Sequence, residues 1–234
     1  MSFKGKTVLV TGASGNLGRT VATAFIANDA NVIAVDRDLA CLTEVYGATS
    51  KQCLTVAADL TNSDQVRLAV RAGLDGFGRI DVLCNIAGGF WMGPQVHQTD
   101  QADWDRMFDM NVRGLLNVVR EVVPTMIDAG GGKIVNVAAN SALRGAAQMG
   151  AYCASKDVVV RLTETMSLEL RDHSINVNCV LPSILDTQDN RRAMPDADFG
   201  RWVTTEALSD VMLFLASPSA RAINGVALAV TGRV

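Results

Sequence analysis

TGASGNLG, from Thr11 to Gly18, is the stretch of the sequence that decides the fold. It follows an apolar, β-branched run, Lys6–Thr11 (KTVLVT), and opens a helical pattern that extends to Asn28. Glycines at this spacing permit a tight turn, a close approach of the backbone to a pyrophosphate and close packing of the helix against the strand. The N–H groups at the start of that helix would hold the phosphates. The stretch therefore predicts a dinucleotide site; a glycine-rich turn without a ligand is the alternative.

Outside this loop, short apolar runs alternate with longer helical patterns. Further strands are expected at Asn31–Val35, Gln52–Ala57, Ile80–Asn85, Lys133–Ala138, Ile175–Leu181 and Gly225–Val230. Helices are expected at Asn16–Asn28, Asn62–Phe77, Ala102–Ala129, Met149–Arg171 and Thr204–Ala216. Runs that are apolar on both faces are typical of parallel strands covered by helices on each side. We therefore expect a three-layer α/β structure, a doubly wound Rossmann fold with a seven-stranded parallel sheet, as a single domain over residues 1–234.

The composition limits the class of protein. The chain has 234 residues, of which 49% are hydrophobic, so a large core forms without disulfides. A net charge of −3 without a basic tract gives no support for nucleic-acid binding, and no apolar run approaches the ~20 residues that span a membrane. Five scattered cysteines and two histidines lack metal-ligand spacing. The early strand pattern leaves no room for a signal peptide, so we expect a cytoplasmic protein with reduced thiols and no metal.

Carboxylates stand at the ends of two expected strands. Asp36 ends the second strand, where a carboxylate would accept hydrogen bonds from the adenosine ribose and repel a 2′-phosphate. This favours NAD as the cofactor, while Arg37 would offset part of the repulsion and leaves NADP possible. Asp59 and Leu60 follow the third strand and would line the adenine side, although Asp59 is equally suited to cap the next helix. The loop residues expected to bind the cofactor are Gly12, Ser14, Gly15, Asn16, Leu17 and Gly18.

Tyr152 and Lys156 are four residues apart in the expected helix Met149–Arg171, so both project from one face. A free tyrosine has a pKa near ~10, and a nearby ammonium group favours the phenolate. Such a tyrosine can give a proton to a carbonyl oxygen or remove it in the reverse direction. Lys156 can also bond the nicotinamide ribose. The pair therefore predicts an oxidoreductase that moves a hydride between nicotinamide and a carbonyl or alcohol.

With these motifs in order, the chain resembles the short-chain dehydrogenase/reductase family along essentially all of its length. The matching pieces are TGASGNLG, AADL, Asn85–Gly88 (NIAG), MNVRG, KIVNVA, YCASK and LPSILDT. The resemblance implies that Tyr152 is the acid/base with Lys156 as its partner, and that Asn111 holds a water linking Lys156 to solvent. It also implies cofactor contacts for Asn85, Ala87, Gly88, Pro182, Ile184 and Thr187.

The family's usual catalytic serine is missing. It stands thirteen residues before the tyrosine, where this chain has Ala139. Ser141 is two residues later and is the nearest substitute, together with Asn140; a simple loop hydroxyl is the alternative for Ser141. The GxxGxxG spacing and the missing serine make the chain similar to the dihydropteridine reductase-like branch of the family. A quinonoid substrate is already electrophilic and would need less polarisation by a serine.

The expected substrate side is apolar. Phe90, Trp91, Met149 and Met194 are expected to form a pocket for a small-molecule substrate, although each could instead anchor the irregular segment Pro182–Arg201, the expected lid. Arg144, Arg191 and Arg192 are candidates for binding an acidic group, or are simply solvated. The apolar content of the two long helices predicts a homotetramer or homodimer. Three hypotheses follow: an NAD(P)-dependent oxidoreductase, a quinonoid dihydropteridine reductase, and a non-catalytic dinucleotide-binding regulator.

Overall fold

The central sheet confirms the predicted doubly wound architecture. In the computed structural model, which describes residues 1–47 and 49–234, the strand order is β3-β2-β1-β4-β5-β6-β9, with all neighbours parallel. The strands are β1 (Thr7–Thr11), β2 (Asn31–Asp36), β3 (Cys53–Ala57), β4 (Val82–Asn85), β5 (Gly132–Val137), β6 (Ile175–Pro182) and β9 (Ala227–Val230). The chain direction across the sheet reverses between β1 and β4, which is where ligands of such sheets bind.

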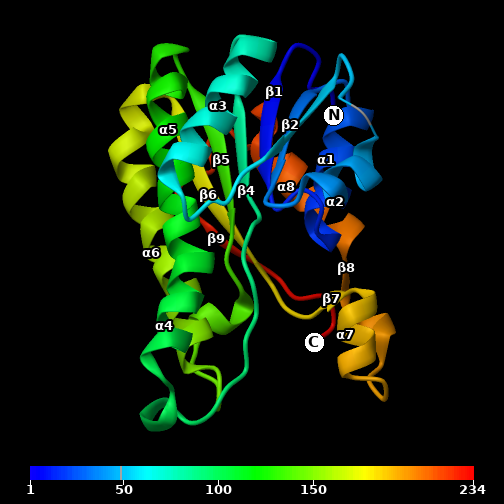
Figure 1. Cartoon of the computed structure of the whole chain (residues 1–234), viewed down its shortest axis with the longest axis vertical. Coiled ribbons are helices and arrows are strands. Elements are labelled where there is room, and N and C mark those ends of the chain that lie inside the picture. Colours follow the sequence, from blue (N-terminus) through cyan, green and yellow to red (C-terminus); the bar gives the residue numbers. More distant parts are fainter. Residues whose placement is uncertain (48) are drawn as a thin grey trace.

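Helices cover both faces of this sheet (Figure 1). One face carries α1 (Asn16–Ala27), α2 (Leu39–Tyr46) and α8 (Thr205–Ala216); the other carries α3 (Ser63–Phe77), α5 (Gly114–Asp128) and α6 (Gly150–Leu170). Each face has its own apolar core, with Phe25 and Met212 on the first and Val118 and Val159 on the second. Both cores consist of buried side chains, and burying these side chains is the main force that holds the layers together.

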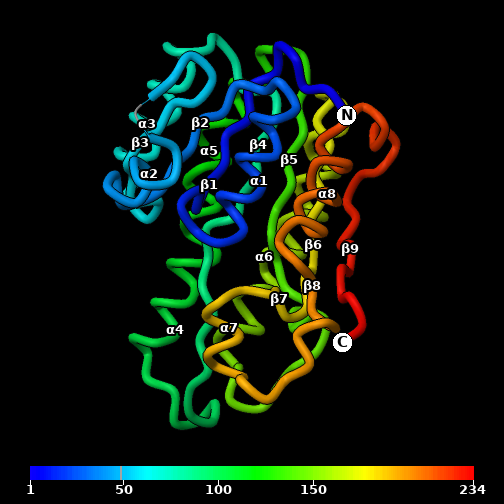
Figure 2. Tube along the Cα trace, turned by 90° about the vertical axis from the view of Figure 1, so that its right-hand side faces the viewer, coloured from blue at the N-terminus to red at the C-terminus, as the bar shows by residue number. Residues whose placement is uncertain are grey.

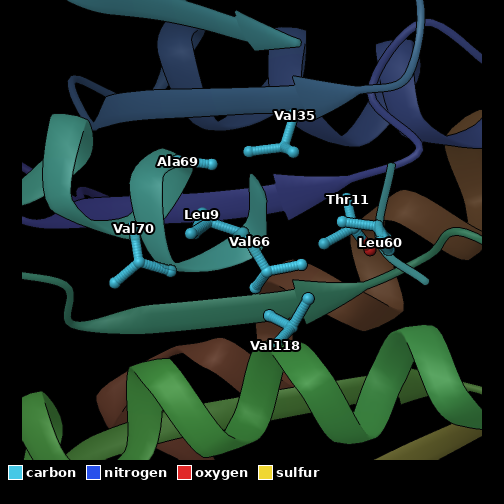
Figure 3. Close-up of a pocket in the computed structure, with 8 residues that line it drawn as sticks. All are labelled: Leu9, Thr11, Val35, Leu60, Val66, Ala69, Val70 and Val118. Carbon is cyan, nitrogen blue, oxygen red and sulfur yellow. The ribbon is translucent and has the colours of Figure 1, made fainter. Parts of the chain in front are cut away.

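The packing of α3 illustrates how the second face closes. Val66, Ala69 and Val70 repeat at helical spacing and point toward the sheet (Figure 3). They meet Leu9 and Val35 of the two neighbouring strands and enclose a small apolar cavity. The side chain of Asn62 caps this helix by accepting from the backbone N–H groups of residues 64 and 65. Periodicity and cap together explain why this helix was predicted to within one residue.

The predicted single helix Ala102–Ala129 is wrong in one respect. It consists of α4 (Gln101–Phe108), a π-helical turn over Asp109–Arg113 and then α5. A π-helical turn inserts one residue into the helix, and such turns occur frequently at functional sites. Hydrophobic periodicity does not reveal this insertion, because the apolar stripe continues on both sides of it.

Three further elements were not predicted. They are α2, the short helix α7 (Gln188–Ala193), and a two-stranded sheet of β7 (Leu185–Asp186) and β8 (Val203–Thr204). The segment 182–201, expected to be irregular, therefore contains ordered structure. Figures 1 and 2 show α4 and α7 beyond the same end of the sheet. Among the described residues no helix is both long and apolar enough to cross a bilayer.

Candidate active site

A groove runs along the carboxyl ends of the strands, and residues of α4 and α7 contribute to its lining. The predicted site residues that line it are Gly12, Ser14, Gly15, Asn16, Leu17, Gly18, Asp36, Arg37, Asp59, Leu60, Ala87, Gly88, Phe90, Ser141, Met149, Tyr152, Lys156, Pro182, Ile184, Thr187 and Met194. Asn85, Trp91 and Asn111 are the predicted residues that do not line it. The fold thus brings most of the expected cofactor and substrate residues into one continuous site.

The glycine loop forms the phosphate end of the groove. Gly12 has a φ of 64°, and a Cβ at this position would lie 2.9 Å from the Cα of Ala87. A Cβ on Gly18 would lie 2.0 Å from the carbonyl oxygen of Gly12, so the helix start packs directly on the turn. Gly15 caps α1 without any side-chain hydrogen bond, which leaves the N–H groups of the first turn available to an anion. The loop therefore has the shape and donors that a pyrophosphate needs.

Asp36 lies beside this loop at the end of β2. Its Oδ2 accepts from the backbone N–H of Ser14 at 3.0 Å and from the Ser14 hydroxyl at 2.7 Å. Its Oδ1 accepts from the backbone N–H of Arg37 at 2.7 Å. Neither lysine nor arginine forms an ion pair with Asp36 in the part of the chain that the structure describes. The carboxylate group therefore lies at the wall of the groove without a basic side chain paired to it.

Tyr152 and Lys156 project from the first turns of α6 into the groove, as the spacing predicts. Lys156 is 5% exposed, and its Nζ donates to the carbonyl oxygen of Val137, at the end of β5, at 3.0 Å. Burial lowers the pKa of Lys156 to about 8. Burial also raises the pKa of Tyr152 to about 12, and a side-chain hydrogen bond with Ser141 acts in the opposite direction. Two ionisable groups with shifted pKa values in one groove are typical of an active site.

Ser141 reaches Tyr152 despite standing two residues out of register. A 3₁₀ turn over Asn140–Leu143 follows β5 and brings the Ser141 side chain to the phenol. Ala139, in the position of the family's usual serine, also lines the groove but offers only a methyl group. The turn therefore brings the Ser141 hydroxyl near Tyr152, although Ser141 stands two residues after the position of the family's usual serine.

Asn111 lies in the π-helical turn and is 2% exposed. Its Oδ1 accepts from the backbone N–H of Gly89 at 2.9 Å, and its Nδ2 donates to Gly89 O at 3.1 Å and to Ser155 Oγ at 3.0 Å. A Cβ on Gly88 would lie 2.7 Å from Asn111 Oδ1 and 3.0 Å from Lys156 Nζ. Asn111 thus joins the loop after β4 to α6, directly behind the catalytic candidates.

Two of the residues that were predicted to contact ligands, Asn85 and Trp91, do not line the groove. Asn85 was expected to lie along the cofactor, but it is 4% exposed and donates from Nδ2 to Asn136 Oδ1 at 2.9 Å, inside the sheet. Trp91 was expected to line the substrate pocket, but its ring lies under the guanidinium of Arg106, 5.4 Å from the ring centroid. Both side chains are therefore engaged with other residues of the protein, and their predicted ligand contacts stay predictions.

Phe90 remains as the aromatic wall of the site. Its ring meets that of Tyr152 edge-on, with the centroids 5.0 Å apart. Met149 and Met194 also line the groove, so the substrate side is apolar around a polar centre. Met110, which the sequence analysis missed, lies against Gly89 and adds to this wall. Its place in the π-helical turn explains why periodicity did not identify it.

The three candidate arginines have different surroundings. Arg191 pairs with Asp186 through two nitrogens, at 2.6 and 2.7 Å, and lies over the ring of Phe199. Arg192 is 3.4 Å from a carboxylate oxygen of Asp189. Both arginines therefore contact residues within their own segment, residues 185–202. Arg144 lines the groove.

Comparison with known proteins relates nearly the whole chain to one family of enzymes. Residues 6–198 match the family described as short chain dehydrogenase. Sorbitol dehydrogenase of Cereibacter sphaeroides is 33% identical, over 94% of this chain and 93% of the relative. The structure of a 3-ketoacyl-(acyl-carrier-protein) reductase from Brucella melitensis complexed with NADH superposes with a TM-score of 0.89 at 32% identity, over 99% of both chains. ElxO with NADP bound has a TM-score of 0.89 at 25% identity, over 97% of both chains.

Proposed function

The chain belongs to the short-chain dehydrogenase family and is an NAD- or NADP-dependent oxidoreductase acting on alcohol or carbonyl substrates, and we propose that Tyr152 is its acid/base, supported by Lys156 and Ser141. The observation that carries this proposal is the convergence of these three side chains in one groove, where the Ser141 hydroxyl acts to lower the pKa of the Tyr152 phenol. Family membership makes the chain an enzyme, so the non-catalytic regulator is no longer needed as an explanation.

The residues present fit a dinucleotide. The glycine loop would hold the pyrophosphate, Asp36 the adenosine ribose, and Lys156 the nicotinamide ribose. Ala87, Gly88, Ile184 and Thr187 also line the groove and would hold the rest of the cofactor. When it is bound, the nicotinamide gives or accepts the hydride. The protein's own task is to place the substrate oxygen beside Tyr152 and to move the proton.

Proton transfer follows from the state of each side chain. In the reducing direction, the protonated phenol of Tyr152 donates its proton to the substrate oxygen. In the oxidising direction, the phenolate takes that proton back. The Lys156 ammonium favours the Tyr152 phenolate through its charge. The Ser141 hydroxyl donates a hydrogen bond toward the substrate oxygen as negative charge develops on that oxygen.

This assignment gives a pH dependence with a definite sign. Because the pKa of Tyr152 is raised to about 12, only a small fraction is phenolate at pH 7, and this fraction rises with pH. We therefore expect kcat/KM for alcohol oxidation to rise about tenfold per pH unit from pH 7 to 8. The rise becomes shallower above the Lys156 pKa of about 8, where the ammonium loses its charge.

Initial rates of NAD⁺ reduction with one alcohol across pH 6–10 measure this profile, and rates of carbonyl reduction serve as the control because they use the protonated phenol. An oxidation rate that falls between pH 7 and 8 would contradict the assignment of Tyr152 as the base.

We propose NAD rather than NADP as the preferred cofactor. A 2′-phosphate on the adenosine ribose would approach the Asp36 carboxylate, and the two negative charges would repel each other. NADH is expected to bind at least tenfold more tightly than NADPH, and Asp36→Asn is expected to narrow this ratio while keeping an acceptor for Ser14. Fluorescence titration with each reduced cofactor measures both ratios. Equal or tighter binding of NADPH by the wild type would refute this preference.

The dihydropteridine reductase-like assignment remains a finer proposal about the substrate. It is supported by the GxxGxxG loop, by Ala139, and by the ring of Phe90 set edge-on to Tyr152, which suits a flat substrate. Turnover of quinonoid dihydropterin with NADH, beside a panel of polyols, ketones and β-ketoacyl thioesters, decides it. Reduction of a ketone without any pterin turnover would remove this assignment and leave the family function intact.

We also propose that the single domain assembles with copies of itself through α5 and α6. Leu116 of α5 and Leu168 of α6 are 37% and 64% exposed, so both helices present apolar side chains outward. Light scattering at micromolar concentrations should give the mass of a dimer or tetramer. A monomeric mass over this range would contradict the proposal.

A further inference from the structure

We infer that Tyr46, which does not line the groove, is a positioning residue that sets the affinity for NAD by fixing one peptide unit of the glycine loop. The inference rests on the proposed dinucleotide function. The peptide unit is the one between Ala13 and Ser14. The Tyr46 hydroxyl donates to its carbonyl oxygen at 2.6 Å, and its N–H donates to Asp36 Oδ2 at 3.0 Å. Both ends of a single peptide plane are therefore held by the β2–α2 unit.

The Ala13 carbonyl lies on the buried side of the loop. Ala13 is fully buried and does not line the groove, whereas Gly12, Ser14 and Gly15 around it do. Its own N–H donates to the carbonyl oxygen of Val35 at 3.1 Å. In the part of the chain that the structure describes, the Tyr46 hydroxyl donates the hydrogen bond that the Ala13 oxygen accepts. Losing it would leave a buried carbonyl without a partner.

Tyr46 is well placed to act as a permanent donor. It is the last residue of α2, and its ring packs against the core that lies under α1 and α8. Burial raises the pKa of Tyr46 well above the usual value for tyrosine, so the hydroxyl stays protonated at any working pH. It acts through the loop, since it lines no part of the groove.

The orientation of this peptide unit matters because of its dipole. With the Ala13 carbonyl held on the buried side, the negative end of the dipole points away from the phosphates. Without the hydroxyl, the peptide unit can rotate to find another donor, and the carbonyl oxygen then turns toward the groove. A negative partial charge near a pyrophosphate weakens binding, and the weakening is confined to ligands that carry phosphate.

The test is Tyr46→Phe, which removes one oxygen and keeps the ring packed. We expect the Kd of NADH to rise about tenfold and that of ADP by a similar factor, while the Kd of adenosine changes less than twofold. The kcat at saturating NADH is expected to stay at the wild-type value. Fluorescence titration measures NADH, and calorimetry measures ADP and adenosine. The matched control is Thr43→Ala on the same helix, whose exposed hydroxyl donates to Leu39 O within α2.

Equal weakening of NADH and adenosine would indicate a general distortion and overturn the inference, as would an unchanged Kd for NADH. A wild type that binds no NADH would instead overturn the proposed function. If the Tyr46→Phe variant does not fold, hydrogen exchange of the wild type provides an independent test. The backbone amide hydrogen of Ser14 should exchange slowly with solvent before any NADH is added. Rapid exchange of that amide would show that the peptide unit is not held and would count against the inference.

Discussion

Replacing Tyr152 with Phe is expected to lower kcat about 10³-fold, within the range of ~10²–10⁴ that a positioned acid or base contributes. The variant keeps the ring, so its edge-on contact with Phe90 and the packing of α6 are retained. It loses the only atom of this side chain that can exchange a proton with the substrate oxygen. Initial rates with a panel of alcohols and ketones measure the loss.

NADH binding is the control for this prediction. The glycine loop and Asp36, which would hold most of the cofactor, are untouched, so the Kd of NADH is expected to stay within about threefold of the wild type. A kcat within tenfold of the wild type would contradict the role of Tyr152. Loss of both turnover and NADH binding would instead point to a damaged groove.

Replacing Ser141 with Ala is expected to lower kcat about 10²-fold, as the removal of one donor from a developing oxyanion typically costs ~10²–10³ in rate. The reason is that Ala139 cannot supply the hydroxyl that the family usually has there, while the turn over Asn140–Leu143 brings Ser141 to the phenol. The pKa of Tyr152 should also rise further, since the Ser141 hydrogen bond lowers it.

The matched control is Ser183→Ala. Ser183 also lines the groove, but its hydroxyl is engaged with the carbonyl oxygen of Thr231 at 2.9 Å. Its kcat should change by less than threefold. Introducing Ala139→Ser into the Ser141→Ala background tests whether a hydroxyl in the family's usual position restores part of the rate. Unchanged kcat in Ser141→Ala would mean that the substrate needs no second donor.

The sheet could be predicted from the sequence because its strands are buried on both faces. Runs such as VIAV in β2 have few alternatives to a parallel strand, and every predicted strand was confirmed with ends within two residues. The glycine loop and the pair Tyr152 and Lys156 could also be predicted, because their function depends on local spacing. Predicting these features requires only residues that are close together along the chain.

The remaining features depend on contacts between distant segments. Asn111 turns toward Gly89 because a π-helical turn inserts a residue, which leaves no mark on the hydrophobic pattern. Asn85 turns into the sheet to meet Asn136, a partner 51 residues away. Tyr46 reaches Ala13 across 33 residues from a helix that was not predicted. Side-chain direction in each case is set by a partner that one sequence does not identify.

The proposed role of Ser141 lies between these two groups. The sequence identified it as the nearest hydroxyl to the missing serine, but its two-residue offset argued against it. The 3₁₀ turn removes the offset by advancing the chain in a tighter coil than a strand would. The turn thus supports a catalytic role for Ser141, which the sequence had already identified as a candidate.

A crystal structure of the protein with NAD⁺ and the best alcohol of the panel tests the central claim most directly. The measurement is the set of distances from the alcohol oxygen to the protein. We expect hydrogen bonds of about 2.6–2.9 Å between this oxygen and both Tyr152 Oη and Ser141 Oγ, with Lys156 Nζ bonded to the nicotinamide ribose. An alcohol oxygen bonded to other side chains, with Tyr152 out of reach, would contradict it.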